Sequence, residues 1–97
     1  MTDLERARGI IDEVDEKMAE LFERRMDAVA LVAAYKQEHG LQVFDPVREE
    51  QNILTNSARI RNEAYRSCYI RFLRSLMDIS KDYQKELRQN SGAGGKK

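Results

Sequence analysis

Apolar residues recur every seven positions along the first 38 residues of the chain. One heptad column contains Leu4, Ile11, Met18 and Val32, and the column three positions further contains Ala7, Val14, Leu21, Ala28 and Tyr35. Such a pattern, held for nearly five heptads, is typical of a long helix with one apolar seam. Thr2 or Asp3 can cap its start, and Gly40 suits the left-handed position beyond a helix end. We therefore predict a first helix that ends at Glu38.

A second helix is predicted after a short connection at residues 41–44. Asp45 is a favoured N-cap residue, and Pro46 fits the first turn, where its missing N–H costs no hydrogen bond. The segment that follows is polar, and we expect the helix to end at about Ile60.

A third helix is predicted from Asn62, which can cap it, to about Gln89, because apolar residues recur there at spacings of three and four. The last residues are rich in glycine and are expected to be flexible. The sequence thus predicts an all-α protein with three helices. Its helical domain covers residues 1–89 and its tail covers residues 90–97.

The first helix is too long for a compact monomer of this size. A helix of about 36 residues spans about 54 Å, whereas a compact chain of 97 residues has a radius of gyration of about 12.5 Å. The apolar seam continues along the part that must overhang, and the simplest cover is a second copy related by a twofold axis. We therefore predict an intertwined helical homodimer.

Composition excludes several classes of function. The 17 basic and 17 acidic residues balance to zero net charge, which argues against general nucleic-acid binding, because that needs an excess of cations. One cysteine excludes an intrachain disulfide framework, and one histidine leaves no histidine pair for a metal. No apolar run has the length of a membrane span, and the first residues lack signal-peptide features. We expect a cytoplasmic protein without a metal or a membrane segment.

Three cations interrupt the apolar face of the first helix. Arg25 occupies the heptad column of Leu4 and Val32, and Arg8 and Lys36 lie in the neighbouring column. A buried charge is costly unless an anion pairs with it. Arg25 therefore pairs with a carboxylate of the same protein, specifies the register of a helix pair, or binds an acidic ligand. The pattern alone leaves these alternatives open.

Polar residues also interrupt the other two helices. Ser80 and Gln84 lie in an otherwise apolar stripe of the third helix, and the second helix opens with Asp45, Arg48 and Glu49, where free backbone N–H groups favour an anion. Ordinary interpretations are hydrogen bonds between helices, capping and a solvated ion pair. If these residues converge with the cations, they form a site for a small, multiply anionic molecule with a hydroxyl or ether group.

The polar residues also follow a fixed order along the chain. Arg8 precedes the Glu23-Arg24-Arg25 segment, Lys36 lies eleven residues after Arg25, a D-x-x-R-E turn covers residues 45–49, and Ser80 and Gln84 form an S-x-x-x-Q pair. This order, over roughly residues 4–88, resembles that of the all-helical chorismate mutases of the shikimate pathway. The resemblance implies a domain-swapped homodimer with two identical sites. It also implies the rearrangement of chorismate to prephenate without a cofactor.

The resemblance implies how the two carboxylates of chorismate are held. Arg25 and Arg48 of one chain would grip them together with Arg8, which would reach in from the partner chain. Ser80 and the backbone near Asp45 would help to position a carboxylate.

The resemblance also implies how the reacting part of the substrate is surrounded. Lys36 and Gln84 would donate hydrogen bonds to the ether oxygen of the breaking bond, and Glu49 would hold the ring hydroxyl. Val32 and Met77 would form apolar walls.

Two other functions are compatible with these residues. An isochorismate-pyruvate lyase would use a similar cationic pocket on the same scaffold, although Glu49 favours the mutase. A non-catalytic helical dimerisation or regulatory module would need Arg25 and Lys36 for stability or assembly rather than for activity.

Overall fold

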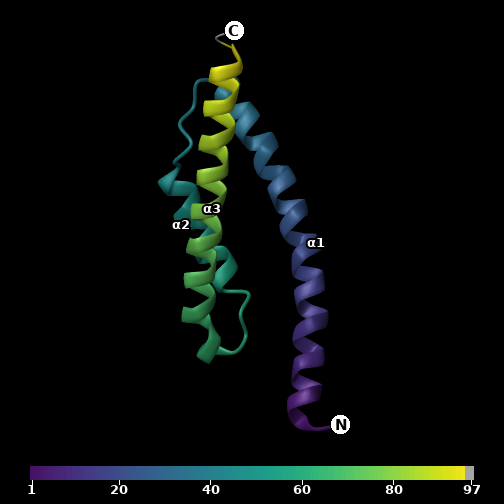
Figure 1. Cartoon of the computed structure of the whole chain (residues 1–97). Coiled ribbons are helices and arrows are strands. Elements are labelled where there is room, and N and C mark those ends of the chain that lie inside the picture. Colours follow the sequence, from purple (N-terminus) through teal and green to yellow (C-terminus); the bar gives the residue numbers. More distant parts are fainter. Residues whose placement is uncertain (96–97) are drawn as a thin grey trace.

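The computed structural model describes residues 1–95, which form the three helices of Figure 1. Helix α1 covers Asp3–Glu38, α2 covers Pro46–Ser57 and α3 covers Glu63–Gly95. The described residues contain no strand, so the predicted all-α class with three helices is confirmed. None of these helices is long and apolar enough to cross a membrane.

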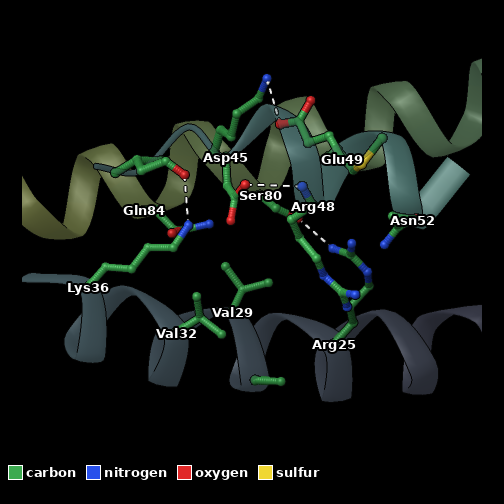
Figure 2. Close-up of a pocket in the computed structure, with 14 residues that line it drawn as sticks. Arg25, Val29, Val32, Lys36, Asp45, Arg48, Glu49, Asn52, Ser80 and Gln84 are labelled. Carbon is green, nitrogen blue, oxygen red and sulfur yellow. Dashed lines mark hydrogen bonds and ion pairs between the residues drawn. The ribbon is translucent and has the colours of Figure 1, made fainter. Parts of the chain in front are cut away.

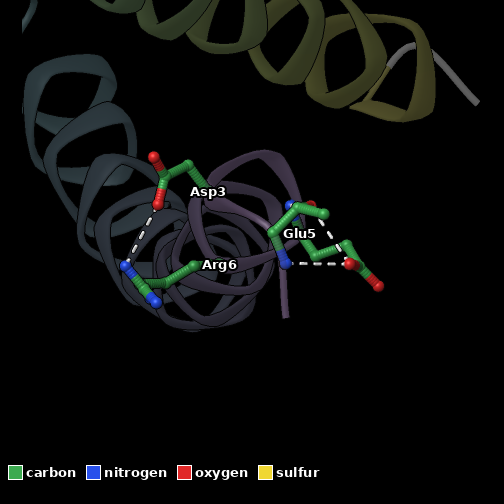
Figure 3. A network of polar contacts seen from close by, with 4 residues as sticks. Asp3, Glu5 and Arg6 are labelled. Carbon is green, nitrogen blue, oxygen red and sulfur yellow. Dashed lines mark hydrogen bonds and ion pairs between the residues drawn. The ribbon is translucent and has the colours of Figure 1, made fainter.

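Helix α1 begins with a capping box, part of which is drawn in Figure 3. Thr2 Oγ1 accepts a hydrogen bond from Glu5 N at 3.1 Å, and Glu5 Oε1 accepts one from Thr2 N at 3.0 Å. These bonds satisfy N–H groups that a helix start leaves free. Because the carboxylate of Glu5 accepts the bond from Thr2 N, the pKa of Glu5 is lowered. Thr2, one of the two predicted caps, is therefore the residue that starts the helix.

Helix α1 ends in a Schellman motif at the predicted glycine. Gly40 has a φ of 67°, which glycine adopts without steric cost. Gly40 N donates to Gln37 O at 3.3 Å and Leu41 N donates to Lys36 O at 2.7 Å, the bonding pattern of this motif. The turn fixes the direction in which the chain leaves α1 and enters the connection to α2.

Helix α2 starts as predicted but ends earlier. Asp45 Oδ1 accepts a hydrogen bond from Arg48 N at 3.1 Å, and Pro46 occupies the first turn. The helix ends at Ser57, before Ile60, and Ile60 N donates to Ser57 O at 3.2 Å. Asparagine and serine side chains compete for backbone hydrogen bonds, and Asn56 precedes Ser57 here, which explains the early end.

Helix α3 continues to Gly95, past the predicted end at Gln89. The chain has no proline after Pro46, so no residue removes a backbone donor from the helical hydrogen bonds. The predicted tail at residues 90–97 is therefore helical as far as Gly95. Positions 96 and 97 lie outside the described residues, and the flexibility of the tail stays a prediction.

Helix α3 packs against both α2 and the C-terminal half of α1 (Figure 1). The buried apolar residues are Val29, Ala33, Val43, Ile53, Leu73 and Met77. Towards its N-terminus, α1 diverges from the other two helices, and none of its residues before Val29 is buried. The radius of gyration is 17.3 Å, against about 12.5 Å for a compact chain of this length. The single chain thus leaves much of the predicted apolar seam uncovered.

Candidate active site

A pocket of about 300 Å³ lies between the C-terminal half of α1, α2 and α3, and Figure 2 shows the residues that line it. This volume is at the lower end of the range for small-molecule sites. The lining includes nine residues singled out from the sequence, namely Arg25, Val32, Lys36, Asp45, Arg48, Glu49, Met77, Ser80 and Gln84. Residues that are distant in sequence therefore meet at one place.

Arg8 is the exception among the residues singled out, because it does not line this pocket. It is exposed on α1, about 26 Å from Arg25 along the helix axis at 1.5 Å per residue. Within one chain it is too far from the pocket to contact a ligand there. The contribution of Arg8 from a partner chain stays a prediction.

Arg25 has a hydroxyl as its partner in the pocket. Its Nη1 donates to Ser80 Oγ, and Ser80 Oγ donates in turn to Leu76 O at 2.8 Å. The pKa of Arg25 is lowered, first by burial and then by the charge of Arg48. No carboxylate within residues 1–95 forms an ion pair with Arg25. One of the three explanations left open for Arg25, an ion pair inside the same chain, is therefore excluded for the described residues.

Lys36 and Arg48 also point charges at the pocket without a carboxylate partner in the described chain. Lys36 is half-buried, and its Nζ donates to Val43 O at 2.8 Å. Arg48 uses its backbone N–H for the cap of α2, and Figure 2 shows its side chain extending into the same region as Arg25. Three cations thus converge from two helices on one space.

The polar side chains of α3 lie on the buried wall of the pocket. Ser80 is 5% exposed and Gln84 is 7% exposed. Gln84 Oε1 is buried and has no hydrogen-bond partner among the described residues. Because a buried acceptor without a partner is costly, this oxygen indicates that a hydrogen-bond donor of a ligand or a water belongs beside it.

Lys81 is a pocket residue that the sequence analysis missed. Its Nζ lies 3.0 Å from Glu49 Oε2, and this contact raises the pKa of Lys81. A signal was available, because Met77, Ser80, Lys81 and Gln84 follow the spacing of one helix face.

Asn52 is the second polar residue that the sequence analysis missed. Its Oδ1 accepts a hydrogen bond from Asn56 Nδ2 at 3.0 Å, and Asn56 Oδ1 accepts one from Arg59 Nε at 3.0 Å. Arginine can only donate, so this chain of bonds fixes both amides and leaves Asn52 Nδ2 to donate towards the pocket. Asn52 lies three residues after Glu49, and this helical spacing could have indicated that the two residues share a face. The other unpredicted lining residues are Ala28, Val29 and Val43.

The chemistry of the pocket follows from its charges. Four cations and two carboxylates line it, which leaves an excess of two positive charges for a ligand to balance. Amide and ammonium donors lie beside apolar walls, where a hydrogen bond to a negative oxygen is stronger than in water. No three described histidine, cysteine or acidic residues cluster as metal ligands do. The arrangement is suited to grip, orient and electrostatically stabilise a small dianion.

Comparison with known proteins agrees with this chemistry. The chain matches the sequence model of the chorismate mutase type II family over residues 7–85, a segment that contains Arg8 and every residue of the pocket. No curated protein and no solved structure matches the chain.

Proposed function

The chain belongs to the chorismate mutase type II family, and we propose that it converts chorismate to prephenate in the pocket between its three helices. Family membership indicates an isomerase that acts on chorismate. The observation that supports this pocket as the site is the convergence of Arg25, Lys36 and Arg48 without carboxylate partners in the described chain. Chorismate carries two carboxylates, which supply the missing anions.

The reaction sets the tasks of the protein. In this [3,3] rearrangement the ether C–O bond of chorismate breaks while a C–C bond forms between the side chain and the ring. No proton is transferred and no covalent intermediate with the protein is needed. The protein must therefore fold the enolpyruvyl side chain over the ring and stabilise negative charge that develops on the ether oxygen.

The arginines supply the first of these tasks. Arg25 and Arg48 grip carboxylates with charge-assisted hydrogen bonds, and the bond from Arg25 to Ser80 holds the guanidinium against α3. The backbone near Asp45 adds a polar contact to a carboxylate. Holding both ends of the substrate in a reactive conformation lowers the barrier, because orientation is fixed before the reaction starts.

Lys36 and Gln84 supply the second task. One of the three ammonium donors of Lys36 binds Val43 O, which leaves two for a ligand. Gln84 is buried opposite, and its amide nitrogen is the atom that can donate, whereas its unpartnered Oε1 can only accept. Both residues donate to the ether oxygen as its charge grows, while Glu49 accepts from the ring hydroxyl. Val32 and Met77 contact the apolar faces of the substrate.

A second copy of the chain completes the site. The exposed large apolar side chains on α1 before Arg25 are Leu4, Ile10, Ile11, Val14, Met18, Leu21 and Phe22. Pairing two such helices about a twofold axis covers these side chains and brings the Arg8 of each chain towards the pocket of the other. We propose this intertwined, domain-swapped homodimer as the active form.

The proposed function is tested by incubating the purified protein separately with chorismate and with isochorismate. We expect chorismate to disappear and prephenate to accumulate in equal amount, with no product from isochorismate. Release of salicylate and pyruvate from isochorismate, without prephenate formation from chorismate, would assign the lyase reaction instead. Absence of turnover with either substrate would favour the non-catalytic dimerisation module.

A further inference from the structure

The carboxylate of Glu49 is held by a residue from another helix. Lys81 of α3 places its Nζ 3.0 Å from Glu49 Oε2, and the dashed line at the Glu49 carboxylate in Figure 2 marks this ion pair. The two side chains are 21% and 23% exposed, so water screens the contact only in part. The backbone of α2 does not fix this carboxylate by itself, because a glutamate side chain rotates about three bonds.

Lys81 is itself held by three segments of the chain. Its Nζ lies 4.7 Å from the centre of the Phe44 ring, which belongs to the connection before α2. It also lies 3.3 Å from Asp78 Oδ1, one turn earlier on α3. The hydrogen bond to Glu49 is the main cause of the raised pKa of Lys81, so the cation is kept throughout the neutral range. A fixed cation at this position gives Glu49 a fixed partner.

We propose that Lys81 is a positioning residue that orients Glu49 towards the ring hydroxyl of the substrate and neutralises its charge. The proposal rests on the function proposed above. Since Lys81 occupies Oε2, Oε1 is the oxygen that accepts from the hydroxyl. An uncompensated Glu49 would also repel a dianion, and the cation of Lys81 offsets this repulsion.

The proposal is tested by a double-mutant cycle in kcat/KM for chorismate. Lys81→Met keeps an unbranched side chain but removes the charge, and we expect it to lower kcat/KM about tenfold, within the range of couplings between contacting residues. Lys81→Arg restores a cation and should recover most of this loss. In a Glu49→Gln background, Lys81→Met should change kcat/KM less than about twofold, because the negative charge that Lys81 neutralises is absent from that background.

The control is Lys85→Met, which removes an exposed lysine one turn further along α3 and should leave kcat/KM and the melting temperature unchanged. Independent losses that multiply in the double variant would overturn the proposal, because Lys81 would then act without Glu49. Full activity of Lys81→Met would also overturn it while the proposed function stands. A wild-type protein that leaves chorismate unchanged would overturn both.

Discussion

Replacing Lys36 with alanine is expected to lower kcat for chorismate about a hundredfold, the usual effect of removing one preorganised donor from a developing negative charge. In the proposed mechanism, the ammonium group interacts more strongly with the ether oxygen in the transition state than in the bound substrate. Therefore kcat and kcat/KM should fall together, while KM changes little. The initial rate of chorismate disappearance measures both quantities.

The fold should survive this change. The hydrogen bond from Lys36 Nζ to Val43 O is a single charge-assisted contact, and its loss costs about 2 kcal/mol of stability. Circular dichroism at the assay temperature checks that the variant remains helical. The matched control is Lys85→Ala on the exposed face of α3, which should keep wild-type kcat. A helical Lys36→Ala variant with full kcat would contradict the proposed mechanism.

Replacing Arg25 with methionine is expected to separate stability from activity. Burial and the neighbouring charge of Arg48 lower the pKa of Arg25, so the folded protein holds this cation at a cost. Burying a charge costs free energy that an ion pair would otherwise offset, so replacing this partly buried cation with an apolar side chain removes that cost. The melting temperature of Arg25→Met should therefore equal or exceed that of the wild type.

The catalytic activity of Arg25→Met should fall, although its melting temperature does not. Arg25 grips a carboxylate in the proposed mechanism, and a substrate that is no longer held in its reactive conformation loses about a hundredfold in kcat/KM. Arg24→Met, which removes the exposed neighbouring arginine, should leave both quantities near their wild-type values. A dimerisation module predicts the reverse for Arg25→Met, with a lower melting temperature or loss of assembly. Thermal denaturation and the chorismate assay on the same preparations distinguish the two outcomes.

The helix boundaries show why local signals are informative. The capping residues Thr2 and Asp45 and the left-handed Gly40 act within a few residues of chain, so their effects can be predicted without the tertiary structure. The predicted ends of α2 and α3 differ from the observed ends by several residues. There the sequence offers only weak propensities, from Asn56 and Ser57 in one case and from several glycines in the other.

The candidate site was predictable where polar residues interrupt an apolar pattern. Arg25, Ser80 and Gln84 stand out for this reason, and the structure brings all three to one pocket. Lys81 and Asn52 did not stand out, because lysine and asparagine side chains are mostly exposed on helices. Only the approach of α2 to α3 shows that Lys81 meets Glu49. Contacts between helices depend on packing, which a single sequence does not specify.

The proposal that two chains build each site around chorismate depends on Arg8, because Arg8 does not line the pocket of its own chain. It can be examined by combining two defects in one dimer. Arg8→Ala removes the residue proposed to come from the partner, and Lys36→Ala removes a residue of the pocket itself. In a heterodimer of these two variants, one site retains both residues and the other site lacks both.

The most direct measurement is therefore the chorismate mutase activity of this heterodimer, purified through a different affinity tag on each chain. Each parent homodimer should lose about a hundredfold in kcat, whereas the heterodimer should recover about half of the wild-type activity per dimer, since one of its two symmetric sites is intact. A heterodimer no more active than its parents would contradict the account, as would failure of the two chains to associate.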